Sequence, residues 1–204
     1  MIVIIDYGLG NVLAFANVYK KLNIQARVAR SVADLADATR VILPGVGAFD
    51  HAMECLDQSG MREALTDLVI HQGVPVLGIC VGMQILANSS DEGQLPGLGW
   101  VPGRVRKFDV ATLSQKTRLP HMGWNDVRPV RPDGLFAGLE NDARFYFLHS
   151  YYFVCEQNDE VLATTDYGPS FSSAVSLGNV YGVQFHPEKS HHFGTRLLQN
   201  FAGV

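Results

Sequence analysis

Strand-like runs alternate with longer amphipathic stretches along the first half of this chain. The strand-like runs lie at residues 2–5, 25–30, 40–44 and 74–79. Helical patterns lie between and after them, at 11–22, in a short stretch that Ser31 can cap, at 48–73, and from Cys80 to about Asn88. Largely apolar strands are buried on both faces of a sheet, and helices between such strands make parallel crossovers. The order therefore predicts an α/β fold with a mostly parallel central sheet flanked by helices.

The second half of the chain has a different pattern. Strand-like segments follow one another with turn residues between them, at 99–108, 124–130, 143–154, 160–167, 172–178 and 179–185. Strands that are joined by short turns pair in antiparallel fashion. We therefore expect antiparallel strands added to the parallel sheet, and a final helix over 194–203 that closes the domain.

Length and composition limit the classes of protein to consider. With 204 residues, 47% of them hydrophobic and 18% charged, the chain can bury a core, and we expect one domain over residues 1–204. The net charge of −4 provides no basic footprint for nucleic acid. No apolar run approaches the ~18 residues of a membrane span, and the N-terminus lacks the basic segment of a signal peptide. We expect a cytoplasmic protein that binds neither nucleic acid nor membrane.

The cysteines and histidines do not form a recognisable metal or disulfide pattern. Cys55, Cys80 and Cys155 are too few and too scattered for a disulfide framework. No Cys/His spacing resembles a zinc site, and the pair His191–His192 is too isolated to predict one. We expect neither a metal nor another cofactor.

The segment "DYGLGN" at 6–11 invites comparison with a dinucleotide-binding loop. The glycine pattern of such a loop requires glycine at position 13, which is Leu13. The second predicted strand also carries Arg27 and Arg30 where an acidic residue would bind a ribose. Both differences argue against a nucleotide site here.

Cys80 lies at the centre of "GICVGMQ" (78–84), between an apolar strand and a helix. The form Gly-x-Cys-x-Gly at such a junction is that of a nucleophile elbow, in which a strained turn exposes the nucleophile. The first N–H groups of the following helix favour a thiolate. A buried cysteine that fills an apolar core has the same local pattern. The motif alone leaves both interpretations of Cys80 open.

A catalytic cysteine needs a base, because an ordinary cysteine is mostly a thiol at neutral pH. The segment "QFHPEKS" (184–190) offers His186, with Glu188 two residues later, after an apolar strand. Such residues point the same way in an extended segment, and Pro187 favours extended geometry for His186. The carboxylate would then orient the imidazole as the third member of a catalytic triad does. An exposed salt bridge in a loop is the alternative.

The segment "LPGVGAF" (43–49) places two glycines directly after a strand. Its exposed backbone N–H groups can form an oxyanion hole together with the N–H of Val81, the residue after Cys80. An ordinary turn between a strand and a helix gives the same pattern.

Taken together, "GICVGMQ", "PGVG" and "FHPEKS" resemble the triad-type, class I glutamine amidotransferases over the whole chain. The segments "DYGLGN", "LPGVGAF", "LPHMGWN" (119–125), "FYFLHSY" (145–151) and "QFHPEKS" are similar, in the same order, to those of the glutaminase subunits of imidazole glycerol phosphate synthases. This resemblance implies that glutamine is hydrolysed to glutamate and ammonia through a cysteinyl thioester.

The same resemblance implies a role for particular residues. Cys80 would be the nucleophile, His186 the proton carrier and Glu188 the group that orients His186. The oxyanion would be held by backbone N–H groups of Val46 and Val81. The residues implied in glutamine binding are Gly47, Gln84, Glu92, Ser150 and Tyr151.

A partner is implied as well. Members of the resembling family form a heterodimer with a (β/α)8 synthase subunit and pass ammonia through its barrel. The positions that match this interface are Asn11, Trp124, Tyr146 and Lys189. Paralogous subunits that supply ammonia for amidine formation on bacterial surface sugars share the same motifs, so the sequence leaves the acceptor open. A third hypothesis, a non-catalytic scaffold of a synthase, conflicts with the presence of a complete set of candidate catalytic residues.

Overall fold

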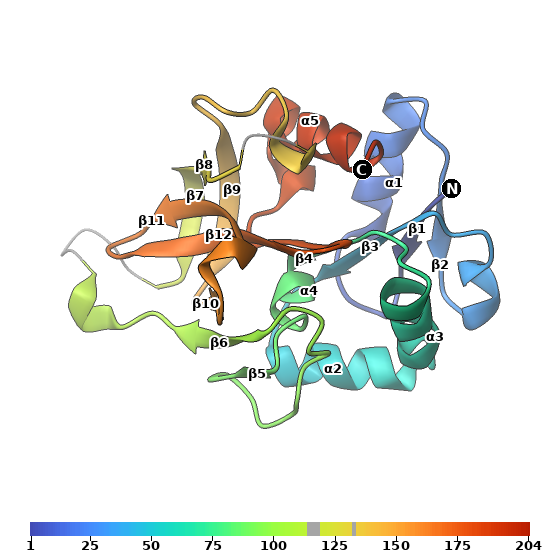
Figure 1. Ribbon diagram of the computed structural model, residues 1–204, viewed down its shortest axis with the longest axis horizontal. Coiled ribbons are helices and arrows are strands. Elements are labelled where there is room, and N and C mark those ends of the chain that lie inside the picture. Colours follow the sequence, from blue (N-terminus) through green and yellow to red (C-terminus); the bar gives the residue numbers. More distant parts are fainter. Residues whose placement is uncertain (114–118, 132–133) are drawn as a thin grey trace.

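The computed structural model describes residues 1–113, 119–131 and 134–204. Its central sheet has the parallel strands that the apolar runs of the first half predict, joined by β13 from the second half (Figure 1). The parallel strands lie side by side in the order β2 (Ala26–Ala29), β1 (Ile2–Ile5), β3 (Arg40–Gly45), β4 (Val76–Cys80) and β13 (Val180–Val183). β4 therefore has a parallel neighbour on each side.

Helices cover both faces of this sheet (Figure 1). One face carries α1 (Val12–Lys21) and α5 (His191–Phe201), and the other carries α2 (Phe49–Gln58), α3 (Arg62–Thr66) and α4 (Val81–Gln84). The Asn11 side chain caps α1 by accepting the N–H of Ala14 at 3.2 Å, which satisfies one of the free donors of the first turn. The π-helical turn η2 (Asp67–His71) continues α3. In the part of the chain that the structure describes, no helix is long and apolar enough to cross a membrane.

The antiparallel additions predicted for the second half are present. β12 (Ser170–Leu177) pairs with β13 and continues the sheet in antiparallel fashion through β10 (Tyr151–Cys155) and β6 (Gly103–Lys107). The short strand β5 (Ser89–Ser90) then pairs with β6 in parallel. On a branch, β11 (Val161–Asp166) pairs with β12 and β8 (Arg128–Pro129). β7 (His121–Asp126) and β9 (Arg144–His149) instead form a separate two-stranded sheet.

The strand-like segment 143–154 is two strands that belong to different sheets. β9 pairs with β7 in the small sheet, whereas β10 pairs with β6 and β12 in the large one. The chain changes sheet at Ser150, which lies between the two strands. The apolar pattern continues across this corner, so the pattern alone did not reveal it.

The predicted helix after Cys80 is shorter than expected. α4 ends at Gln84 rather than near Asn88. Asn88 instead bonds to the start of β6, where its N–H donates to the Gly103 carbonyl at 3.0 Å and its side chain accepts the Gly103 N–H at 2.9 Å. This pairing draws the chain away from a helical path. α5 differs in the other direction, because it begins at His191 rather than at residue 194.

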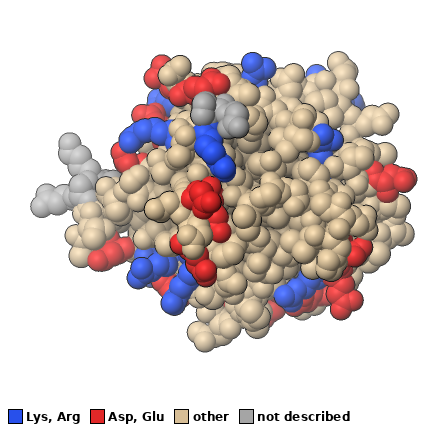
Figure 2. All heavy atoms as spheres, viewed as in Figure 1, with Lys and Arg blue, Asp and Glu red and all other residues tan. Residues whose placement is uncertain are grey.

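Acidic and basic side chains lie beside one another on the face shown in Figure 2, and uncharged residues cover most of that face. Beneath the surface, one hydrophobic cluster extends from Ile2 on β1 to Phe201 on α5. The core therefore joins the two ends of the chain.

Candidate active site

The turn at the end of β4 is strained, as the elbow motif predicts. Cys80 has φ 56° and ψ −113°, a backbone conformation that residues with a side chain rarely adopt. A Cβ atom on Gly82 would lie 1.9 Å from the Leu43 carbonyl oxygen, and one on Gly78 would lie 2.5 Å from the Gly82 oxygen. Both glycines are therefore required for the close approach of β3, β4 and the first turn of α4.

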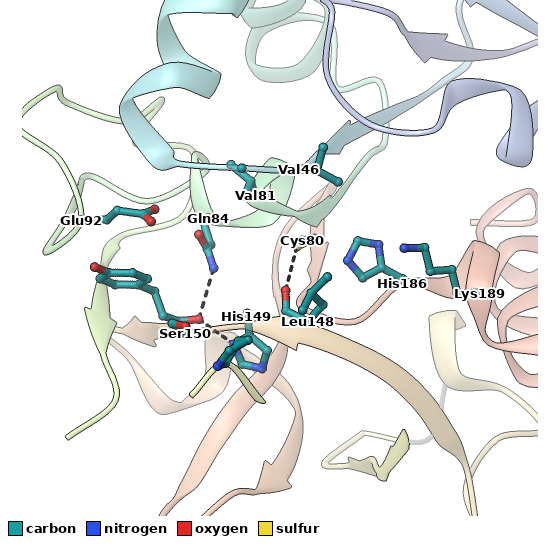
Figure 3. Close-up of a pocket in the computed structure, with 13 residues that line it drawn as sticks. Val46, Cys80, Val81, Gln84, Glu92, Leu148, His149, Ser150, His186 and Lys189 are labelled. Carbon is teal, nitrogen blue, oxygen red and sulfur yellow. Dashed lines mark hydrogen bonds between the residues drawn. The ribbon is translucent and has the colours of Figure 1, made fainter. Parts of the chain in front are cut away.

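The Cys80 thiol lies at the carboxyl end of the sheet, against a cavity of about 280 Å³ (Figure 3). Its sulfur is 3.9 Å from the Leu148 carbonyl oxygen and 3.8 Å from Nε2 of Gln184. The residue is 4% exposed. Cys80 is thus buried as a core cysteine would be, but its side chain borders a hollow rather than filling the core.

The pair His186–Glu188 is buried, so the alternative of an exposed salt bridge is wrong. His186 Nδ1 lies 2.9 Å from Oε1 of Glu188, and the two side chains are 3% and 5% exposed. His186 is extended, as expected, but Pro187 starts the 3₁₀ helix η6 (Pro187–Lys189) instead of continuing an extended segment. Proline suits the first position of a helix because its φ is already helical. The carboxylate reaches the imidazole from this turn.

The surroundings of His186 favour its charged form. Burial lowers the pKa of His186, but hydrogen bonds to Cys80 and Glu188, and the charges of both groups, outweigh burial and raise the pKa to about 9. The ring is therefore cationic at neutral pH. A cationic imidazole beside a sulfur stabilises negative charge on that sulfur.

The backbone of His186 is fixed to the small sheet. Its N–H donates to the Tyr146 carbonyl at 2.8 Å. The Ser190 hydroxyl donates to the His186 carbonyl at 2.6 Å and accepts the Tyr146 N–H at 3.0 Å. Ser190 was not among the predicted site residues, although it ends the motif "FHPEKS". Its buried hydroxyl joins β9 to the segment that carries the imidazole.

Most of the predicted site residues line the same cavity (Figure 3). They are Val46, Gly47, Cys80, Val81, Gln84, Glu92, Ser150, Tyr151, His186 and Lys189. The lining also includes Pro120, Leu148 and His149, which were not among the predicted site residues, although His149 begins the segment 149–151 that the resemblance implies for the α-carboxylate. The motifs could have pointed to these residues, since Pro120 lies in "LPHMGWN" and Leu148 and His149 lie in "FYFLHSY".

The two backbone segments predicted to hold an oxyanion lie side by side. Gly45 ends β3 in register with Cys80 on β4, so the next residues, Val46 and Val81, follow paired positions (Figure 3). Val81 opens α4, where the first N–H groups have no partner inside the helix. Val46 is 43% exposed, and Gly47 has φ 101°.

Gln84 and Glu92 are held by hydrogen bonds at one side of the cavity (Figure 3). The Gln84 side-chain nitrogen donates to the Tyr151 carbonyl at 3.2 Å and to Oε1 of Gln184 at 2.9 Å. Glu92 accepts the N–H of Phe49 at 2.9 Å, at the start of α2. A carboxylate at a helix N-terminus is stabilised by the free N–H groups there.

Asn11, Trp124 and Tyr146 lie outside the cavity lining. Trp124 is 39% exposed and stacks on His191, with ring centroids 5.2 Å apart and planes 8° from parallel. Lys189 lines the cavity and also places its ammonium 5.8 Å from the centroid of the Tyr146 ring. Trp124 is therefore at the surface rather than in the core. Asn11 is exposed at the start of α1.

No group of three or more His, Cys, Asp or Glu side chains within the described residues is arranged to hold a metal ion. The cavity lining presents the thiol of Cys80, the imidazoles of His149 and His186 and the carboxylate of Glu92.

Comparison with known proteins identifies relatives over the whole chain. Residues 3–203 match the family "Glutamine amidotransferase class-I". The imidazole glycerol phosphate synthase subunit HisH of Bdellovibrio bacteriovorus is 65% identical over 204 residues, which is 100% of both chains. The protein of the same name from Leptospira interrogans is 50% identical, again over 100% of both chains.

Solved structures share the fold at lower identity. A crystal structure of a glutamine amidotransferase superposes with a TM-score of 0.74 at 22% identity, over 99% of both chains. A glutamine amidotransferase of Thermotoga maritima superposes with a TM-score of 0.64 at 16% identity, over 97% of this chain and 80% of that chain. These structures show the α/β fold, and the sequence matches show the family. The chain belongs to the class I glutamine amidotransferases and, among them, to the family of imidazole glycerol phosphate synthase subunit HisH.

Proposed function

We propose that Cys80, His186 and Glu188 form the catalytic triad of a glutaminase. The chain is the glutaminase subunit of an imidazole glycerol phosphate synthase and serves histidine biosynthesis. The observation that carries the assignment of the triad is the buried 2.9 Å contact between His186 and Glu188, with the Cys80 sulfur beside the imidazole at the end of β4.

The reaction proceeds through an enzyme-bound thioester. The Cys80 sulfur attacks the side-chain amide carbon of glutamine, while His186 holds the proton that leaves the thiol. His186 then gives this proton to the departing nitrogen, so that ammonia leaves and a γ-glutamyl thioester remains. Water, activated by the same imidazole, hydrolyses the thioester to glutamate and restores the thiol. Glu188 keeps the ring in one orientation and stabilises its charged form.

The tetrahedral intermediates carry negative charge on the former amide oxygen. The backbone N–H groups of Val46 and Val81 donate to this oxygen. Support comes from the registry of Gly45 with Cys80, which brings the two donor segments together at the cavity. Removing one such donor from an enzyme typically costs about 10²–10³ in rate.

Glutamine is oriented by the opposite end of the cavity. The Glu92 carboxylate binds the α-ammonium group, and the segment 149–151 binds the α-carboxylate, with Ser150 and Tyr151 as its contacts. Gly47 and Gln84 complete the site. All of these residues line the cavity that Cys80 borders, which supports the assignment.

The ammonia goes to a (β/α)8 synthase subunit that docks on this chain as a heterodimer. Ammonia released into water is protonated and loses its nucleophilicity, so a direct transfer between subunits preserves it. Asn11, Trp124, Tyr146 and Lys189 form part of the docking surface. The exposure of Trp124 and the contact of Lys189 with both the cavity and Tyr146 support a continuous path from site to surface.

Residues 1–204 act as one domain, since the hydrophobic cluster draws on strands and helices from both ends of the chain. We place the reaction in the cytoplasm. All three cysteines are free thiols, which agrees with a reducing compartment.

One experiment tests the assignment directly. The purified chain is treated with a glutamine analogue that carries an electrophilic carbon in place of the amide, and the labelled peptide is identified by mass spectrometry. We expect one label on Cys80, with protection by excess glutamine. Labelling of Cys55 or Cys155 at the same rate, or no protection by glutamine, would contradict the proposed site.

The acceptor is tested with the synthase subunit encoded in the same genome. The purified complex should form product from the imidazole-pathway substrate with glutamine as the nitrogen source. A complex that forms no product from glutamine, but does so from added ammonia, would contradict the proposed transfer between the subunits.

A further inference from the structure

Two histidines that take no part in the bond-breaking steps lie at the glutamine end of the cavity. His149 lines the cavity at the end of β9, and His121 lies opposite it on β7. They are 6% and 3% exposed, and His149 Nε2 lies 2.9 Å from His121 Nδ1. One ring nitrogen must donate a hydrogen bond to the other in this contact. The neighbouring hydrogen bonds show which nitrogen of each ring carries the proton.

The orientation of the Asn125 side chain determines which nitrogen of His121 carries the proton. Its side-chain oxygen accepts the Asp126 N–H at 2.8 Å, and its nitrogen donates to the Asp166 carbonyl at 2.9 Å. The Asn125 nitrogen therefore also donates to His121 Nε2, 3.1 Å away. Because His121 Nε2 accepts, a neutral His121 carries its proton on Nδ1 and donates it to His149.

A backbone carbonyl determines which nitrogen of His149 carries the proton. His149 Nδ1 lies 2.7 Å from the Tyr151 carbonyl oxygen, which can only accept. The His149 proton is therefore on Nδ1, and its Nε2 is free to accept from His121. The two ends agree, and the donors run in one direction, from Asn125 through His121 and His149 to the Tyr151 carbonyl. A proton added to either ring would place two donors against each other.

The surroundings keep both rings neutral. Burial, together with the nearby His121 and His186, outweighs the bond to Tyr151 and lowers the pKa of His149 to about 3. Burial lowers the pKa of His121 to about 4. The His121 ring stacks on Phe147 and on Tyr167, with centroids 4.6 Å and 3.9 Å apart. These aromatic rings leave the pair little contact with solvent.

The chain of donors ends on the carbonyl that Gln84 also holds. Gln84 Nε2 donates to the Tyr151 oxygen at 3.2 Å from α4, and His149 donates to it from the end of β9. Ser150 and Tyr151 form the cavity wall at this corner between the two sheets. A peptide held by two donors from different elements has little freedom to rotate.

We propose that the neutral His121–His149 pair is a positioning device that fixes the Tyr151 peptide, and with it the wall that binds the α-carboxylate of glutamine. The inference rests on the proposed glutaminase function and adds His121 and His149 as positioning residues. The pair acts on the binding of glutamine rather than on the bond-breaking steps at Cys80. It also makes the cavity wall depend on the position of β7, the strand that carries Trp124.

Two substitutions of His121 separate its hydrogen bond from its packing. His121→Phe keeps a ring that stacks on Phe147 and Tyr167 but removes the donor to His149. His121→Asn keeps an N–H at the place of Nδ1 but removes the ring. In the complex with its synthase subunit, we expect His121→Phe to raise KM for glutamine about tenfold, equivalent to about 1.4 kcal/mol, and to change kcat less than twofold. His121→Asn should return KM to within about threefold of wild type.

Nitrogen-15 spectra of the wild-type histidines provide a test that needs no substitution. At neutral pH we expect both rings to be neutral, with the proton on Nδ1. A charged ring or an Nε2 proton on either residue would overturn the inference. An unchanged KM in His121→Phe, equal KM changes in both variants, or a loss confined to kcat would overturn it as well. In all of these cases the wild-type chain still hydrolyses glutamine, whereas failure of the proposed function would leave it without hydrolysis.

Discussion

Glu92 and Asp50 each bind the backbone of the segment that carries the other. Glu92 accepts the N–H of Phe49 at 2.9 Å, and Asp50, the next residue of α2, accepts the N–H groups of Gln94 and Leu95 at 2.8 and 3.0 Å. This reciprocal clasp fixes the Glu92 loop to the start of α2. α2 begins only three residues after Val46, so the clasp joins the two ends of the proposed glutamine site.

Loss of the clasp should weaken glutamine binding. Asp50→Ala removes both acceptors from the Glu92 loop, and we expect KM for glutamine to rise about five- to tenfold, in line with the ~0.5–1.5 kcal/mol that a hydrogen bond typically contributes. Asp50→Asn keeps one acceptor oxygen, so its KM should lie between those of the wild type and Asp50→Ala. Asp57→Asn is the control, because Asp57 lies on the same helix and pairs with Arg62 at the surface. Equal KM values for Asp50→Ala and Asp57→Asn would refute the role of the clasp.

Cys80→Ala should abolish glutamine hydrolysis, because no other group at the cavity can form the thioester. Synthesis by the complex from added ammonia should persist, since the synthase reaction takes place on the partner subunit. Cys155→Ala, at the end of β10, is the control and should keep glutaminase activity. Both activities are measured as steady-state rates. Hydrolysis by Cys80→Ala within tenfold of wild type would exclude Cys80 as the nucleophile.

The raised pKa of His186 predicts how stability depends on pH. The folded-state pKa of about 9 exceeds the ordinary value of 6.5, so the folded protein binds this proton more tightly than the unfolded chain does. The resulting stabilisation is fully present below pH 6.5 and is lost as pH rises through about 9. Glu188→Gln removes one of the groups that raise the pKa, so the variant should lose less stability over this range.

Urea unfolding at several pH values between 6 and 10 measures this effect. The difference in free energy of unfolding between wild type and Glu188→Gln should shrink as pH rises, and other titrating groups cancel in this difference. A difference that stays constant across the range would show that Glu188 does not stabilise the charged imidazole.

The glycines of "PGVG" predict control of the glutaminase by its partner. Gly45 and Gly47 flank Val46, and rotation of the peptide between Gly45 and Val46 would present or withdraw an oxyanion donor. The isolated chain should therefore hydrolyse glutamine slowly. A synthase subunit with bound ligand should raise kcat by about 10²–10³ and change KM much less, because the gain lies in the transition state. Steady-state glutaminase kinetics with and without the partner test this prediction. If the isolated chain already hydrolyses glutamine at the rate of the complex, the partner does not control the activity.

Tyr7→Phe should stabilise the protein. The Tyr7 hydroxyl is buried, no group among the described residues forms a hydrogen bond with it, and a Cβ on Gly45 would lie 2.7 Å from it. Removing an unpaired buried hydroxyl should add about 1 kcal/mol, or ~3 °C in Tm for a chain of this size. Tyr19→Phe is the matched control, because the buried Tyr19 hydroxyl donates to the Leu198 carbonyl at 3.2 Å and its loss should lower Tm. Equal shifts of Tm in the two variants would contradict the prediction.

The sequence was sufficient where local patterns determine the structure. Apolar runs predicted the parallel strands, and Gly78 and Gly82 predicted the tight turn at Cys80, because only close backbone packing requires glycine on both sides. The motif around Pro187 located the imidazole and carboxylate, although the segment turns into a 3₁₀ helix.

Long-range pairing was not predictable in the same way. The change of sheet at Ser150 depends on which strands lie beside β9 and β10, and these partners are distant in sequence. The donor chain through His121 and His149, and the clasp of Asp50, depend on contacts between elements that only the folded chain brings together. The pattern of apolar and polar residues along the chain does not predict such contacts.

The place of β4 between two parallel neighbours has a consequence for the dynamics of the site. Amide hydrogens of residues 76–79 lie in the middle of the sheet, so they should exchange with deuterium only when the whole domain unfolds. The exposed segment 46–48 should exchange through small local openings. Cys80, the proposed nucleophile at the end of β4, therefore loses its conformational entropy when the chain folds, and only the segment that carries Val46 has to be ordered when glutamine binds.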